Sequence, residues 1–146
     1  MINSLKINQL FANAIQLYNE SKFDLSKKKY EEIIAIDPQH LQSYNNLGLI
    51  HKNHGEIDKS VYYFKKAIEI NPNYQNAYNN LGIVLLEKGE FLNAIENFKK
   101  LIEINPNQYV AYCNLGLCYE KTNKIEKAIN TYELVPSEDK NFLNAQ

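Results

Sequence analysis

The chain has 146 residues, a length that suits one ordinary domain with a substantial core. Hydrophobic residues make up 45% of it and charged residues 23%, and the formal net charge of -1 gives no electrostatic reason to expect nucleic acid as a partner. No apolar run approaches the roughly 20 residues that a membrane-spanning helix needs, and the N-terminal sequence lacks the apolar segment of a signal peptide, so membrane insertion is not expected.

Proline and glycine residues recur along the sequence every 34 residues. Three series share this spacing: Pro38, Pro72 and Pro106; Gly48, Gly82 and Gly116; and Gly55 with Gly89. A proline cannot continue the helix before it, and the last glycine series suits a tight turn, where a positive φ has little cost for glycine alone. The sequence therefore predicts an all-α fold of about four helix-turn-helix units.

The first predicted unit, residues 7–40, departs from the pattern in its first helix. Leu10 stands in place of a tyrosine, Asn13 and Ala14 in place of Leu-Gly, and Ser21 in place of the turn glycine. The second helix keeps the pattern through Ser26, Tyr30, Ile33 and Pro38. A terminal unit of a repeat array is expected to be atypical.

The next two units, residues 41–74 and 75–108, follow the pattern most closely. In the latter, QNAYNNLGIVLLEKG predicts a helix that stops at Gly89, and FLNAIENFKKLIEI predicts a second helix that ends before Pro106. A glycine such as Gly82 inside a helix costs about 1 kcal/mol relative to alanine. We therefore predict that two helices cross there so closely that a Cβ atom would clash.

The fourth unit, residues 109–136, has Asn123 at its turn and a proline that comes four residues early, at Pro136. The last helix should therefore be shorter by about one turn. Residues 137–146 follow, with Ser137 as a candidate N-cap. They form either a short cap helix, covering the last unit with Phe142 and Leu143, or the start of a truncated fifth repeat. Either arrangement predicts an apolar C-terminal edge that could drive formation of a homo-oligomer.

The two cysteines, Cys113 and Cys118, fall five residues apart in one predicted helix. This spacing places them about 140° apart around the helix axis, so an internal disulfide is not expected. Free thiols and the absence of an export signal favour a reducing, cytoplasmic location. Cys113 has no His or Asp placed beside it by the repeat, so we interpret it as a packing residue rather than a nucleophile.

The pattern of Tyr, Leu-Gly, a small residue, an aromatic residue and Pro at a period of 34 resembles the tetratricopeptide repeat family. The resemblance runs from about residue 7 to about residue 135, nearly the whole chain. It implies one domain, an α-solenoid whose helix pairs stack in a right-handed superhelix, with the first helix of each pair lining the concave face.

Catalytic and metal-binding motifs are absent from the sequence: it contains no HExxH, no GxSxG and no paired CxxC. His51 and His54 have a metal-like spacing but no evident further ligand, and His51 takes a position that Leu85 and Tyr119 hold in later units. The lysine run at 27–29 is interpreted as a solvated outer face. We predict no enzyme activity, no metal and no cofactor.

A second stripe on the first helices, away from the Tyr-Leu-Gly face, is the candidate peptide-binding groove. With its flanking positions it comprises Asn8, Phe11, Ile15, Tyr18, Gln42, Asn45, Asn46, Leu49, Lys52, Asn53, Asn76, Asn79, Asn80, Ile83, Glu87, Asn114, Leu117 and Lys121. Within it, Asn46, Asn80 and Asn114 form one column, next to an aliphatic column of Ile15, Leu49, Ile83 and Leu117.

An asparagine side chain can pair with both the N–H and the C=O of an extended peptide, so this column predicts binding through the peptide main chain. The alternative is that the asparagines only bridge neighbouring helices. The column is similar to the asparagine ladder of the repeat region of O-linked N-acetylglucosamine transferases. The carboxylate clamp of chaperone-binding members of the family is not matched, because its positions carry Phe11, Ile15, Asn76 and Asn80.

The sequence thus favours a non-catalytic protein-protein interaction scaffold that binds an extended peptide segment. One alternative is the substrate-recognition or assembly segment of a larger enzyme, such as a glycosyltransferase or methyltransferase. Another is a scaffold that self-assembles through its uncapped repeat ends.

Overall fold

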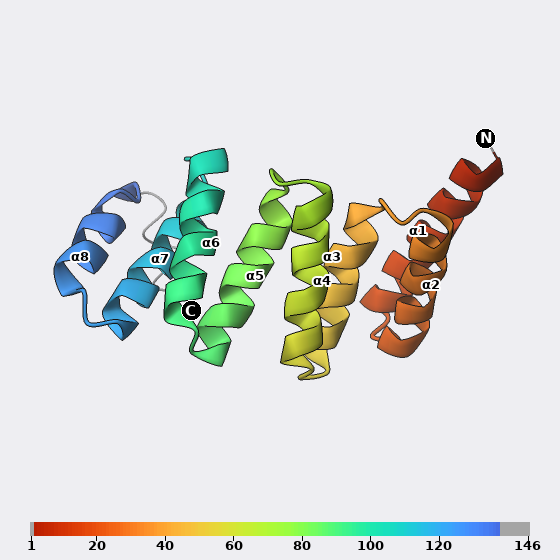
Figure 1. The fold of residues 1–146 in the computed structure, drawn as a ribbon, viewed down its shortest axis with the longest axis horizontal. Coiled ribbons are helices and arrows are strands. Elements are labelled where there is room, and N and C mark those ends of the chain that lie inside the picture. The colour runs from red at the N-terminus through yellow and green to blue at the C-terminus, as the bar shows by residue number, and fades with distance from the viewer. Residues whose placement is uncertain (1, 138–146) are drawn as a thin grey trace. The chain divides into compact units, whose positions relative to one another are not determined.

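The computed structural model describes residues 2–137, which form eight α-helices and no strand (Figure 1). The helices are α1 (Ile2–Asn19), α2 (Phe23–Ile36), α3 (Leu41–Asn53), α4 (Ile57–Ile70), α5 (Gln75–Lys88), α6 (Phe91–Ile104), α7 (Tyr109–Lys121) and α8 (Ile125–Glu133). The predicted all-α class is confirmed, and α5 and α6 end where Gly89 and Pro106 predict. In the described part of the chain no helix is both long and apolar enough to cross a membrane.

The described residues divide into two compact units, with α1–α4 in the first and α5–α8 in the second. In the first unit α1 packs on α2 and α3 on α4, and α2 also packs on α3. The second unit repeats this order, with α5 on α6, α7 on α8, and α6 on α7. Each unit is therefore two helical hairpins joined through the second helix of one and the first helix of the next.

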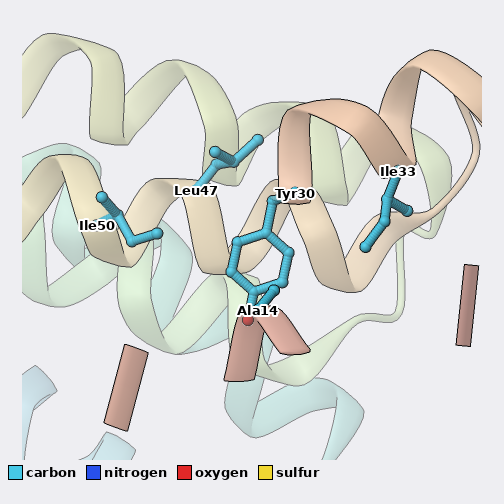
Figure 2. Packing of buried hydrophobic residues seen from close by; sticks show 5 residues of the cluster. All are labelled: Ala14, Tyr30, Ile33, Leu47 and Ile50. Carbon is cyan, nitrogen blue, oxygen red and sulfur yellow. The ribbon is translucent and has the colours of Figure 1, made fainter. Parts of the chain in front are cut away.

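The core of the first unit lies where α1, α2 and α3 meet. Ala14, Tyr30, Ile33, Leu47 and Ile50 form one cluster in which every side chain is at most 1% exposed (Figure 2). Leu47 and Ile50 thus present one face of α3 to α2. The α1 positions one repeat earlier are Asn13 and Gln16, and both are exposed.

The helix glycines of the second and third hairpins allow close crossings, as predicted. A Cβ atom built on Gly48 would lie 2.5 Å from Phe64 Cε1, and one on Gly82 would lie 2.6 Å from Phe98 Cε1. Both distances are well below ordinary van der Waals contact, so the aromatic rings occupy the space that a side chain would need. In the first unit, buried hydroxyls add a bond at each crossing: Ser26 Oγ donates to the Ala14 carbonyl and Ser60 Oγ to the Gly48 carbonyl, each at 2.8 Å.

The turns inside the hairpins adopt left-handed backbone conformations. Gly55 and Gly89 have φ values of 72° and 83°, which confirms their predicted role. Ser21 and Asn123 hold the same position in the other hairpins, with φ values of 58° and 56°. Asparagine tolerates this region better than serine, so the strain is greatest at Ser21.

Substitution Ser21→Gly is expected to raise the free energy of unfolding by about 0.5–1 kcal/mol, because glycine removes the left-handed strain at a small entropic cost. Urea denaturation measures the change. The reverse substitution at the matched turn, Gly55→Ser, serves as the control and should lower the stability by a similar amount. Equal stability of Ser21→Gly and the parent chain would contradict the strain at Ser21.

The C-terminal hairpin is shortened as predicted. Helix α8 has 9 residues, whereas α6 has 14, and the chain reaches Pro136 soon after α8 ends. Val135 is nevertheless buried at 1% exposure. Residues 138–146, with Phe142 and Leu143, lie outside the described residues, so the choice between a cap helix and a fifth repeat stays a prediction.

Candidate functional site

A cavity of about 230 Å³ opens in the first unit between α1, α2 and α3. Its lining residues are Ile15, Tyr18, Tyr30, Asn46 and Leu49. Four of these five belong to the stripe predicted from the sequence, and they include both its amide and its aliphatic columns. Helical spacing explains why they meet, since residues three or four apart share one helix face.

Two hydrogen bonds between amide and phenol groups tie the helices together around the cavity. Asn46 Nδ2 donates to the Tyr30 hydroxyl at 2.9 Å, and Asn53 Nδ2 donates to the Tyr18 hydroxyl at 2.9 Å. Burial raises the pKa of Tyr30, so its hydroxyl stays protonated at neutral pH. The predicted bridging role of the asparagine column is therefore present at Asn46.

Tyr30 is the one lining residue of this cavity that lies outside the predicted stripe. Its position reads Tyr30, Phe64, Phe98 and Tyr132 along the four hairpins. Asn46 follows Tyr30 by sixteen residues, and Asn114 follows Phe98 by the same interval. Phe98 has no hydroxyl, so Asn114 cannot form the bond that Asn46 makes. A side-chain bridge of this kind does not explain why the amide recurs.

Other predicted groove residues of the first unit have different surroundings. Asn8 and Gln42 are exposed, and Lys52 is half-buried. Phe11 packs its ring edge-on against Tyr30 and His40, with ring centroids 5.8 and 5.1 Å apart.

Asn45, predicted to flank the groove, is only 5% exposed. It is thus far less accessible than Asn46, and a contact with peptide at this position stays a prediction. Cys113, at the same position of the fourth hairpin, is also buried.

In the second unit, α5 and α7 carry the matching amide and aliphatic columns. Asn80, Ile83, Asn114 and Leu117 are all half-buried, as is the flanking Asn79. Asn76, Glu87 and Lys121 at the margins of the stripe are exposed. Among residues 2–137, the Asn114 side chain forms no hydrogen bond, so its amide can serve a ligand.

His51 takes part in packing. Its ring is 4% exposed and stacks on Tyr63, with the ring planes 6° apart and the centroids 5.0 Å apart. Its Nδ1 atom lies 2.5 Å from Glu56 Oε2, and hydrogen bonds from Lys59 and His51 lower the pKa of Glu56 to about 2. Within the described residues, no group of three His, Cys, Asp or Glu side chains is placed to hold a metal ion.

The remaining chemistry-bearing groups sit in ordinary positions. Both cysteines are free and buried, and burial raises the pKa of Cys118 to about 11, so it stays a thiol at neutral pH. Cys113 Sγ donates to the Tyr109 carbonyl at 3.1 Å. In the lysine run, Lys28 is exposed and Lys29 pairs with Glu32 at 2.9 Å.

Three models of the tetratricopeptide repeat match the chain, over residues 42–74, 63–96 and 85–146. Together they span residues 42–146, well over half of the sequence. The chain belongs to the tetratricopeptide repeat family. Its α-solenoid fold class is thereby confirmed, and tetratricopeptide repeats are generally protein-interaction modules rather than catalytic ones. No curated protein matches the sequence closely enough to count as a relative.

Solved structures share the tetratricopeptide fold of this chain at low sequence identity. One crystal structure of MamA is 22% identical to this chain and superposes with a TM-score of 0.86. The match covers 94% of this chain and 81% of the MamA chain. A second MamA crystal structure is 23% identical, with coverages of 92% and 73% and a TM-score of 0.84.

A mutant of the Thermobaculum terrenum O-GlcNAc transferase is 20% identical, with a TM-score of 0.74. It covers 82% of this chain, which in turn spans 23% of the transferase chain. The expected resemblance to the repeat region of that enzyme is confirmed for the fold.

Proposed function

We propose that this tetratricopeptide protein is an interaction scaffold that binds an extended peptide along its first helices. The supporting observation is the cavity of the first unit, where the predicted amide and aliphatic residues Asn46, Ile15 and Leu49 line one accessible surface. Amides beside apolar side chains suit a ligand whose main chain needs hydrogen bonds and whose side chains need burial.

The amide column supplies the polar half of this recognition. Asn80 and Asn114 are half-buried, so each has part of its side chain within reach of a ligand. A primary amide offers two donors and one acceptor, and an extended peptide presents its N–H and C=O groups in alternating directions. Binding of this kind reads the peptide main chain and is tolerant of sequence.

Selection of a random dodecapeptide library on the immobilised chain tests the proposal. Peptides should be enriched, and replacing both Asn80 and Asn114 by alanine should weaken their binding about tenfold, measured by fluorescence anisotropy. The matched control is Asn97→Ala. Asn97 is a half-buried amide on α6, outside the stripe, and donates to the Asn93 carbonyl.

The test compares the peptide affinity and the folding stability of the double variant with those of the control. Failure to enrich any peptide would contradict the proposed function. The proposal would also be wrong if the double variant lost several kcal/mol of stability yet bound the enriched peptides as well as Asn97→Ala does, because the amides would then serve folding alone.

Self-association is a second candidate, and the outer face of α8 favours it. Ile125 and Ile129 are each 51% exposed, and Leu134 is 63% exposed. In the first unit the counterpart of Ile125 is Phe23, whose ring packs edge-on against His54 at the end of α3, with centroids 5.9 Å apart. The position of Ile129 corresponds to Ile95 in α6, which is 7% exposed. The face that a following helix covers elsewhere is thus open on α8.

Pairing of two copies through α8 should appear as a concentration-dependent dimer in sedimentation velocity. Replacing Ile129 by Lys should abolish that dimer, because a charge would have to be buried at its centre. The control is Asn130→Lys, at an exposed neighbouring position of the same helix. A strict monomer at hundred-micromolar concentration would contradict this candidate.

A further inference from the structure

We propose that the cavity of the first unit is an anchor pocket that takes one neutral, apolar side chain of the bound peptide, such as Leu, Ile, Met or Phe. The inference rests on the proposed peptide binding and adds to it a requirement for one residue type at one place. It concerns Ile15, Tyr18, Tyr30, Asn46 and Leu49, which line the cavity.

The size of the cavity argues for a single side chain. At about 230 Å³ it falls below the range of roughly 300–1,000 Å³ that is typical of sites for whole small molecules. Three of its lining residues, Ile15 on α1 and Asn46 and Leu49 on α3, are at least partly exposed and belong to the stripe that would hold a peptide. A side chain that projects from a bound peptide can therefore enter it while the main chain stays outside.

The lining of the cavity argues for an apolar occupant. Ile15 and Leu49 contribute aliphatic surface, Tyr18 and Tyr30 are aromatic, and Asn46 is uncharged. A lysine or glutamate that entered would lose water without gaining a counter-charge, which is strongly unfavourable. Ile15 is 40% exposed, so an apolar side chain that entered the cavity would bury apolar surface that is now in contact with water.

The polar edge of the pocket is held in place before binding. Asn46 uses its amide nitrogen on the Tyr30 hydroxyl, and in the described part of the chain its Oδ1 atom forms no hydrogen bond. That oxygen is an acceptor for a main-chain N–H of the peptide next to the anchor residue. Because Tyr30 fixes the amide, little side-chain freedom is lost on binding. Tyr30 is thus a positioning residue.

The second unit provides an internal comparison. The residues that follow the five lining residues by 68 positions are Ile83, Leu86, Phe98, Asn114 and Leu117. Both tyrosines are replaced there by side chains without a hydroxyl. The second unit thus repeats the aliphatic surface and the amide but has no phenol to hold the amide, so the anchor function is assigned to the first unit.

Peptides enriched from the dodecapeptide library on the full chain test the pocket directly. Alanine scanning of the tightest peptide should reveal one Leu, Ile, Met or Phe whose replacement by alanine weakens binding roughly tenfold or more. Replacement of the same residue by glutamate should weaken binding further. Anisotropy titration gives both values.

Substitution Ile15→Lys places a cation at the mouth of the pocket, and the partial exposure of Ile15 makes the change compatible with folding. A library selected on this variant should enrich Asp or Glu at the anchor position. The matched control is Ile83→Lys, at the counterpart position of α5, which should weaken binding but keep the apolar preference. Circular dichroism verifies that both variants are folded.

Substitution Tyr30→Phe copies the natural residue of the second unit, so it is expected to fold. It should weaken binding about three- to tenfold by releasing Asn46, with little effect on which anchor residue is selected. The inference is wrong if enriched peptides bind through Asn80 and Asn114 while Ile15→Lys leaves their anchor preference unchanged; peptide binding itself then still stands. A library from which nothing binds the parent chain overturns both proposals.

Discussion

Replacing Phe98 by alanine is expected to lower the free energy of unfolding by about 3–5 kcal/mol, the largest effect we predict for a single side chain. Phe98 is fully buried, and its ring lies against the helix backbone at Gly82. The glycine opposite has no side chain that could help to fill the space left behind. Urea denaturation of the full chain, monitored by circular dichroism, measures the loss.

Leu92→Ala is the matched control for Phe98→Ala. Leu92 is on the same helix, is 64% exposed, and should cost no more than about 0.5 kcal/mol when shortened. A cost for Phe98→Ala as small as that of the control would mean that the crossing of α5 and α6 contributes little to stability.

Substitution Gly82→Ala is expected to destabilise the chain although alanine is the better helix former. The new methyl group would lie 2.6 Å from Phe98 Cε1, and overpacking of this kind costs about 1–3 kcal/mol. The gain in helix propensity is about 1 kcal/mol, so the net loss should reach up to about 2 kcal/mol. Equilibrium denaturation of the variant gives the net value.

Two further variants identify the cause of the Gly82→Ala effect. The double variant Gly82→Ala with Phe98→Leu should lose less than the sum of the two single losses, since the smaller side chain relieves the clash. Ala14→Gly makes the reverse change in α1, where the alanine is already accommodated at 0% exposure, and should also destabilise. A Gly82→Ala variant more stable than the parent would refute the close crossing.

Much of the fold could be predicted because glycine and proline have strong local effects. Gly89 takes a positive φ and ends α5, and α6 stops at Ile104, just before Pro106. The interior glycine Gly82 also indicated a close helix crossing, since a helix interior keeps glycine at a cost when another helix needs the space. The partner itself, Phe98, is known only from the structure. These signals depend on one residue and its immediate chain neighbours, so they can be read without knowing the packing.

The site was less predictable because it depends on contacts between successive hairpins. Helical spacing placed Asn46 and Leu49 on one face of their helix, but it could not show that Tyr30 of the preceding helix supplies a hydroxyl beside them. The same limit applies to Asn45, whose 5% exposure results from neighbours that lie elsewhere in the chain. One signal in the sequence could have indicated this hydroxyl: Tyr30 stands at a repeat position that carries phenylalanine in the next two hairpins, Phe64 and Phe98.

The polar outer face of α1 restricts where the array can be lengthened. Gln9, Asn13 and Gln16 are exposed on α1, whereas the matching residues of α7, Ala111, Leu115 and Cys118, are buried. An engineered hairpin placed before α1 would bury amides with few partners, a cost that substituting these three positions would remove. A hairpin added after α8 would instead cover Ile125 and Ile129. A designer who extends this repeat array should therefore add units at its C-terminal side.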